Sequence, residues 1–146
     1  MHVPRRDPEV GFTGAWQFRL LPHGTWKTVQ VPEPWTMREA DDRPHHTNVP
    51  MPFSEVPPHV PRVNPEGVCQ RAVELPPRAG RRTILHVGAA EGLLRVTVND
   101  HDLGISTDSH LAAEFAITDA VIEGANTLRL SVDKWSAASW LEDQDH

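Results

Sequence analysis

The chain has 146 residues, and its 14 Lys and Arg against 20 Asp and Glu give a formal net charge of −6 with histidine neutral. This length fits one domain, and the acidic balance argues against a nucleic-acid partner, since contacts to phosphates need clustered Lys and Arg. The sequence has no apolar run of the about 18 residues that a membrane-spanning helix needs. Its lone cysteine, Cys69, cannot form an internal disulfide. We therefore expect one cytoplasmic domain with no nucleic-acid or membrane partner.

Proline dominates the first half of the chain, because all 14 prolines lie between Pro4 and Pro77. Proline lacks a backbone donor and fixes φ, so dense proline excludes helix interiors and central strands. We expect an N-terminal extension and a first strand over residues 1–28. Residues 29–146 are then expected to form the main sandwich, beginning with extended surface connections from Pro32 to Pro65. Apolar anchors recur along these connections, at Trp35, Val49, Phe53, Val56, Val60 and Val63.

The second half alternates apolar and polar residues with a period of two, which is typical of strands buried on one face. The pattern occurs in LLRVTV (93–98) and again in TLRLSV (127–132). Residues 83–87 are more continuously apolar and predict a central strand, whereas residues 111–120 predict at most a short turn. Asn99 and Asp100 tolerate left-handed backbone and are expected to close a hairpin. These features favour an all-β antiparallel sandwich or jelly roll.

Three groups of side chains are candidate carriers of chemistry. The acids at positions 142, 143 and 145 lie too close in sequence to straddle a glycosidic bond, which two carboxyl groups must flank. The nine histidines are scattered and do not show the spacing of a zinc site. Of the five tryptophans, Trp16, Trp35 and Trp135 are expected in the core. Trp140 beside the acids is left open, since an indole face can stack on a sugar ring or pack in a core.

Several motifs together resemble one family from about residue 12 onward, the N-terminal sugar-binding domain of glycoside hydrolase family 2 β-galactosidases. The resemblance is carried by WQFRL (16–20), VPEPW (31–35), HTNVPMPF (46–53), PPHVPRVNPEG (57–67), DSHLAAEFAIT (108–118), GANTLRLSVDKWS (124–136) and WLEDQD (140–145). It implies a galactose-binding-like jelly roll that packs on a (β/α)8 barrel carrying the catalytic glutamates. We expect no such barrel within these 146 residues.

The resemblance also implies which side chains contact the substrate. Asn48 of the TNV motif and Asp145 of the EDQD motif would touch the galactosyl unit. Trp140, which precedes the acidic run, is a third candidate that rests on its residue type and position alone. Asp145 would also share a sodium ion with ligands from the barrel, while the isolated chain is expected to hold no cofactor. Where the family has an aspartate and a glutamine that bind magnesium, this chain has Ala137 and Thr107. We therefore expect no such magnesium site.

Three functions remain open at this point. The leading interpretation is a domain that positions a galactoside for a barrel in the same or another chain, with no hydrolysis by this chain alone. The second is a stand-alone lectin-like module that binds galactosides by itself. The third is a packing or interaction domain without a ligand of its own.

Overall fold

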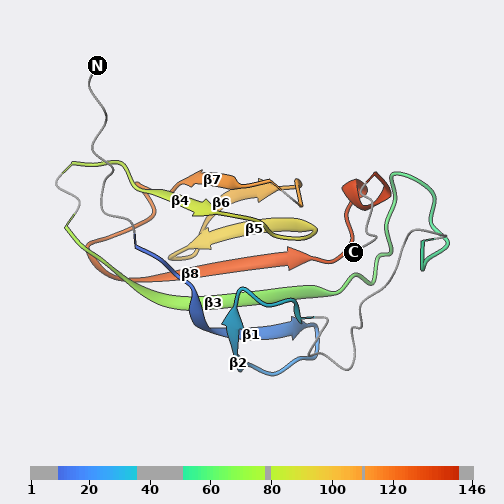
Figure 1. The fold of residues 1–146 in the computed structure, drawn as a ribbon, viewed down its shortest axis with the longest axis horizontal. Helices are drawn as coiled ribbons and strands as arrows, with labels where there is room; N and C mark the ends of the chain where they lie inside the picture. The colour runs from blue at the N-terminus through green and yellow to red at the C-terminus, as the bar shows by residue number, and fades with distance from the viewer. Residues whose placement is uncertain (1–9, 36–50, 78–79, 110, 142–146) are drawn as a thin grey trace, which may run out of the picture.

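The computed structural model describes residues 10–35, 51–77, 80–109 and 111–141, and over these residues the fold is almost entirely β (Figure 1). The elements are β1 (Gly14–Leu21), β2 (Lys27–Val31), β3 (Glu66–Leu75), β4 (Ile84–Val87), β5 (Leu93–Val98), β6 (His101–Ser106), β7 (Ala113–Ala116), β8 (Gly124–Asp133) and the short 3₁₀ helix η2 (Ala137–Trp140). The predicted all-β class is confirmed.

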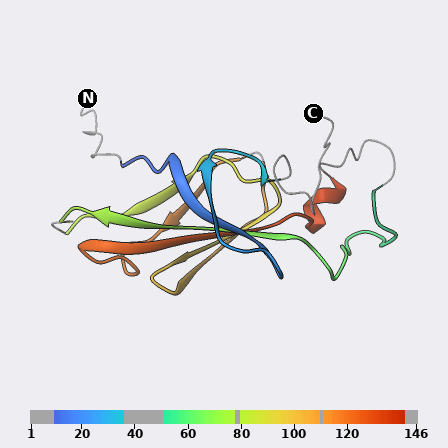
Figure 2. The same ribbon diagram turned by 90° about the horizontal axis from the view of Figure 1, so that it is seen from below.

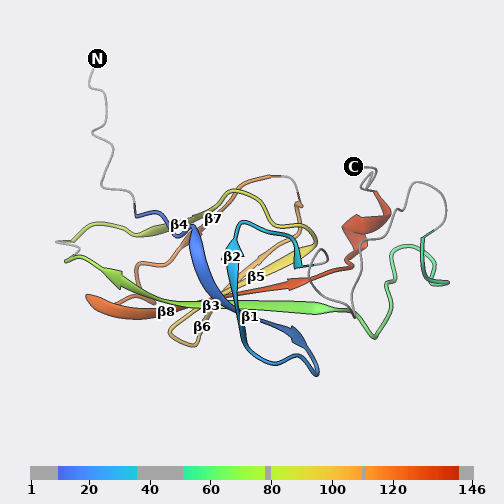
Figure 3. The ribbon, with the colours of Figure 1, turned by 60° about the horizontal axis from the view of Figure 1, so that its bottom comes forward.

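The strands form two antiparallel sheets. The larger sheet has the order β2-β1-β3-β8-β5-β6, and the smaller one pairs β4 with β7. The two longest strands, β3 and β8, run side by side through the middle of the larger sheet over ten paired positions. Figures 1 and 3 show β4 and β7 together on one face of the larger sheet, and Figure 2 shows the same layers from below. The arrangement is an antiparallel β-sandwich.

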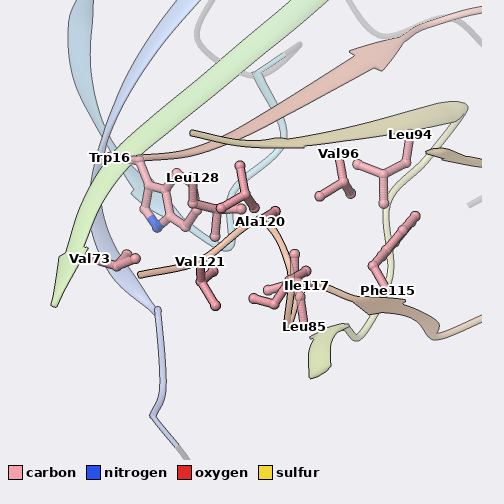
Figure 4. Packing of buried hydrophobic residues seen from close by; sticks show 11 residues of the cluster. Trp16, Val73, Leu85, Leu94, Val96, Phe115, Ile117, Ala120, Val121 and Leu128 are labelled. Atoms are coloured by element: carbon pink, nitrogen blue, oxygen red, sulfur yellow. The ribbon is translucent and has the colours of Figure 1, made fainter. Parts of the chain in front are cut away.

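The hydrophobic core fills the space between the two sheets (Figure 4). Leu94, Val96 and Val98 of β5 are 2%, 0% and 2% exposed, whereas Arg95 between them is exposed. This outcome confirms the predicted period of two, because alternate side chains of a strand point to opposite faces. From the smaller sheet, Leu85 and Phe115 complete the same cluster.

Two of the three tryptophans assigned to the core, Trp16 and Trp135, are buried, and Trp35 is half-buried. The Trp35 ring stacks on Phe18 with 6.0 Å between ring centroids. It also explains Gly67 in β3, since a Cβ atom at Gly67 would lie 2.8 Å from the Trp35 ring. Such a contact is too close for a larger residue, so the glycine admits the ring.

The predicted hairpin is confirmed, because Asn99 and Asp100 join β5 to β6 with φ of 48° and 64°. The Asn99 side chain also ties the turn to its neighbours. Its amide nitrogen donates to Ala120 O at 2.9 Å and to Asn126 Oδ1 at 2.8 Å, and its Oδ1 accepts from Thr127 N at 2.8 Å.

Two strand predictions were wrong. Residues 83–87 were expected to form a central strand, but β4 belongs to the two-stranded sheet and exposes Ile84. Residues 111–120 were expected to hold at most a turn, but they contain β7, whose register pairs Phe115 with Leu85. The single large apolar residue of β7 is too weak a signal for a strand, and the partner strand supplies the stability instead.

Residues 51–65, the longer of the two described parts of the proline-rich connection, contain no strand or helix. Two of its expected anchors are wrong, because Val56 and Val63 are 67% and 88% exposed. Phe53, by contrast, packs between two tryptophan rings. Val49 lies outside the described residues.

Candidate functional site

Of the three predicted substrate contacts, Asn48 and Asp145 lie outside the described residues, and Trp140 lies within them. Trp140 ends η2, which follows β8. In Figures 1 and 3, η2 and the loop of residues 51–65 lie at the same end of the sandwich. This end is the part of the described structure that is nearest in sequence to both predicted sugar ligands.

Trp140 is half-buried and held on two sides. Its indole N–H donates to the backbone oxygen of His59 at 3.0 Å. Its ring meets Phe53 edge-on, with 5.4 Å between ring centroids and an interplanar angle of 89°. The described structure thus gives Trp140 a packing role between the loop and η2, while its contact with a sugar stays a prediction.

Phe53 contacts a second tryptophan as well. Its ring lies 5.3 Å from the ring of Trp135 at an interplanar angle of 70°. Both edge-to-face geometries fall in the range that aromatic quadrupoles favour. Phe53, Trp135 and Trp140, here called the aromatic cluster, therefore join the loop to the chain that follows β8.

Asn64 makes a second connection between the same two segments. Its amide nitrogen donates to Trp135 O at 2.7 Å, and its Oδ1 accepts from Trp135 N at 3.0 Å. One residue along, Lys134 N donates to Pro65 O at 2.9 Å. The Asn64 side chain then makes the next pair of hydrogen bonds, to the backbone of Trp135. It thereby extends the β3–β8 pairing beyond the last strand residues.

The turn into η2 is closed by two serines. Ser136 Oγ accepts from Ala138 N at 3.2 Å, and Ser139 Oγ accepts from Ser136 N at 3.0 Å. The two hydroxyls thus satisfy donors at the start of the helix reciprocally, as in a capping box. Both serines are buried, at 6% and 0% exposure. The spacing Ser-x-x-Ser was a signal for this cap that sequence reasoning did not use.

Two acids meet where the cluster joins the sheet. Asp133 lies opposite Glu66 in the β3–β8 register. Burial raises the pKa of the Asp133 carboxyl above its usual value, Glu66 raises it further, and Arg95 opposes the rise. These two acids come from neighbouring positions on adjacent strands rather than from opposite walls of a cleft. Such a placement does not suit a pair of carboxyl groups that must flank a glycosidic bond.

Other reactive groups are dispersed over the described residues. Burial raises the pKa of the Cys69 thiol to about 11, so this cysteine is protonated at neutral pH. His86 and Glu114 are 3.4 Å apart on the exposed surface of the smaller sheet. Within the described ranges, no group of three or more His, Cys, Asp or Glu side chains could hold a metal ion. No helix there is long and apolar enough to cross a membrane.

Comparison with solved structures supports the fold. A β-D-glucuronidase from Dictyoglomus thermophilum matches with a TM-score of 0.63 and 22% identity, over 84% of this chain and 19% of that one. An FMN-binding β-glucuronidase from Facaelibacterium prausnitzii L2-6 matches with a TM-score of 0.64 and 19% identity, over 87% of this chain and 18% of that one. At these identities the likeness establishes a common fold.

Comparison of sequences is more specific. A β-galactosidase from Arthrobacter sp. (strain B7) is 39% identical over 127 residues, which cover 83% of this chain and 12% of the relative. A β-galactosidase from Vibrio vulnificus (strain YJ016) is 36% identical over 162 aligned positions, covering 99% of this chain and 15% of the relative. The chain therefore spans about an eighth of the length of these relatives. The family model described as the sugar binding domain of glycosyl hydrolases family 2 matches residues 7–146. The chain belongs to this family as its sugar-binding domain.

Proposed function

We propose that this chain positions the galactosyl unit of a galactoside for a catalytic (β/α)8 barrel. The observation that carries the proposal is the family match over residues 7–146, together with relatives that are β-galactosidases over most of this chain. Asn48 and Asp145 contact the sugar in this proposal. A carboxylate accepts hydrogen bonds from two hydroxyls, and an amide both donates and accepts, so the two side chains suit a ring of hydroxyl groups.

The geometry of the described residues supports a shared location for these two ligands. Asn48 is five positions before Phe53, and Asp145 is five positions after Trp140. The rings of Phe53 and Trp140 are 5.4 Å apart. Five residues span at most about 17 Å. Two segments of this length that start from adjacent rings can reach the same sugar. Trp140 then contributes mainly by holding this region together.

The barrel supplies the bond-breaking groups in this proposal. Glycoside hydrolysis needs an acid and a nucleophile or base on opposite sides of the bond, with their carboxyl groups about 5–9.5 Å apart. Asp145 instead holds the sugar through hydrogen bonds, and its carboxylate is a hard oxygen donor suited to a cation such as sodium. The other sodium ligands would come from the barrel. We infer that this chain by itself hydrolyses no galactoside.

The test is steady-state kinetics on a chromogenic galactoside, with the polypeptide in which this chain is joined to its barrel. Asp145→Ala removes charge-assisted hydrogen bonds worth about 1.5–3 kcal/mol each, so kcat/KM should fall by at least about tenfold. Asn48→Ala removes neutral hydrogen bonds and should cost up to about tenfold. The control is Glu123→Gln, which should leave kcat/KM unchanged. Glu123 is an exposed acid immediately before the first residue of β8, at the opposite end of that strand from η2. Wild-type kcat/KM in Asp145→Ala would overturn the proposal.

A further inference from the structure

We propose that Asn64 and Phe53 are positioning residues, which clamp the loop that leads from Asn48 against the turn that leads to Asp145. This inference rests on the proposed function, because it concerns how the two sugar ligands are held. The clamp is defined here as Phe53, Asn64, Trp135 and Trp140, with the backbone oxygen of His59. All of its members lie within the described residues.

The first half of the clamp is the hydrogen-bonded pair between Asn64 and Trp135. The side chain contributes one donor and one acceptor at 2.7 and 3.0 Å. An aspartate at this position has the same shape but no N–H, so it can accept from Trp135 N and cannot donate to Trp135 O. The Asn64→Asp variant therefore breaks half of the connection and places two acceptors face to face, with little change in volume.

The second half is the aromatic cluster. Phe53 meets Trp135 and Trp140 edge-on from one position in the loop, so a single ring holds both ends of the turn that contains η2. The hydrogen bond from Trp140 Nε1 to His59 O closes the other side. The loop is thus attached at residues 53, 59 and 64 to Trp135 and Trp140, on the chain that continues to Asp145.

Apart from the buried Trp135, the side chains of the clamp are only partly buried and lie outside the core cluster between the sheets. The buried core cluster contains residues of β1, β3, β4, β5, β7 and β8 and the turn before β8, and none of Phe53, Asn64 or Trp140 belongs to it. Loosening the clamp should therefore move the loop and the turn relative to each other while the sandwich stays folded. A misplacement of about 1 Å in a substrate-positioning group can cost as much as 100-fold in rate, so a small movement is enough to be measured.

The experiment compares Asn64→Asp, Asn64→Ala and Phe53→Leu in the polypeptide that joins this chain to its barrel. Each should lower kcat/KM for a chromogenic galactoside, by about tenfold for the Asn64 variants and about threefold for Phe53→Leu. The matched control is Gln30→Glu, which adds the same charge at an exposed position of β2 and should leave kcat/KM unchanged. Thermal unfolding of each variant shows whether the sandwich is intact. Should Asn64→Ala fail to fold, the milder Asn64→Asp and Phe53→Leu variants carry the test.

A double-mutant comparison with Asp145→Ala separates positioning from a general loss of stability. If the clamp acts through Asp145, Asn64→Asp lowers kcat/KM much less in the Asp145→Ala background than in the wild type. An equal fall in kcat/KM in the wild type and in Asp145→Ala would overturn the clamp, as would wild-type kinetics of all three clamp variants. Either result would leave the proposed function in place. A normal kcat/KM of Asp145→Ala itself, or a locus that encodes no barrel, would instead contradict the proposed function and the clamp together.

Discussion

Replacing Asn126 with alanine should destabilise the sandwich more than its small volume suggests. Asn126 lies in β8, is 3% exposed, and makes four hydrogen bonds through its side chain. Its Oδ1 accepts from Ile122 N and Asn99 Nδ2, both at 2.8 Å. Its Nδ2 donates to Ile122 O at 2.9 Å and to Gly124 O at 2.8 Å. The side chain therefore organises the turn that enters β8 and links it to the β5–β6 hairpin.

The expected loss of stability follows from the hydrogen-bond partners that are left unpaired in Asn126→Ala. A buried polar group left without a partner costs about 1–3 kcal/mol, and relaxation of the turn lets water reach some of the four groups. We expect a loss of about 3–4 kcal/mol in the free energy of unfolding. For a chain of this size, each kcal/mol lowers Tm by about 2–4 °C, so Tm should fall by about 10 °C.

The assay is urea and thermal unfolding of the 146-residue chain, followed by circular dichroism. Thr127→Ala is the matched control, because Thr127 is exposed and its bond to Asn99 uses its backbone N–H. The control should change the free energy of unfolding by less than about 1 kcal/mol. An equal effect of both variants would refute the reasoning, since the Asn126 network would then contribute nothing beyond a surface residue.

Two further predictions concern single residues of the sheet. The raised pKa of Asp133 means that the folded state binds this proton more tightly than the unfolded state. The folded state therefore loses stability as pH rises from the ordinary pKa of an aspartate through the raised value. Asp133→Asn should increase Tm at pH 7 and bring little gain at pH 3, and an equal gain at both pH values would contradict this. Asp100→Gly should raise the free energy of unfolding in urea by up to about 1 kcal/mol, because Asp100 has φ of 64° and glycine adopts this conformation without steric cost. A lower free energy of unfolding would show that the Asp100 side chain matters more than its backbone strain.

The parts of the fold that the sequence predicted well are those in which local pattern and final environment agree. In β5, Leu94, Val96 and Val98 alternate with polar residues, and Asn99-Asp100 follows at once as a hairpin turn. Both signals lie within eight consecutive residues. The strand and the turn could therefore be predicted without knowing which strands pair with β5.

The central strand β3 was not identified, although it is among the longest. The positions that face the core next to Val73 include Gly67, Cys69 and Arg71, which interrupt an apolar alternation. Gly67 is present because the Trp35 ring lies over it, and Arg71 donates to the backbone oxygens of Phe12 and Thr13. These reasons depend on residues distant in sequence, so no local pattern reveals them.

The candidate site divides in the same way. The assignment of Asn48 and Asp145 came from family motifs, and these residues lie outside the described structure. The role of Asn64 could not be predicted, because its partner Trp135 is 71 positions away in the sequence. The NPEG motif marked Asn64 as typical of the family without showing what it does.

The central claim is that the sugar is held jointly by this domain and a barrel. Its most direct test is a calorimetric titration of a non-hydrolysable galactoside into residues 1–146, into the polypeptide that joins them to the barrel, and into that polypeptide with Asp145→Ala. We predict no saturable binding to residues 1–146, saturable binding to the joined polypeptide, and at least tenfold weaker binding to the variant. Equal affinity of residues 1–146 and the joined polypeptide would contradict the claim and identify a lectin-like module instead.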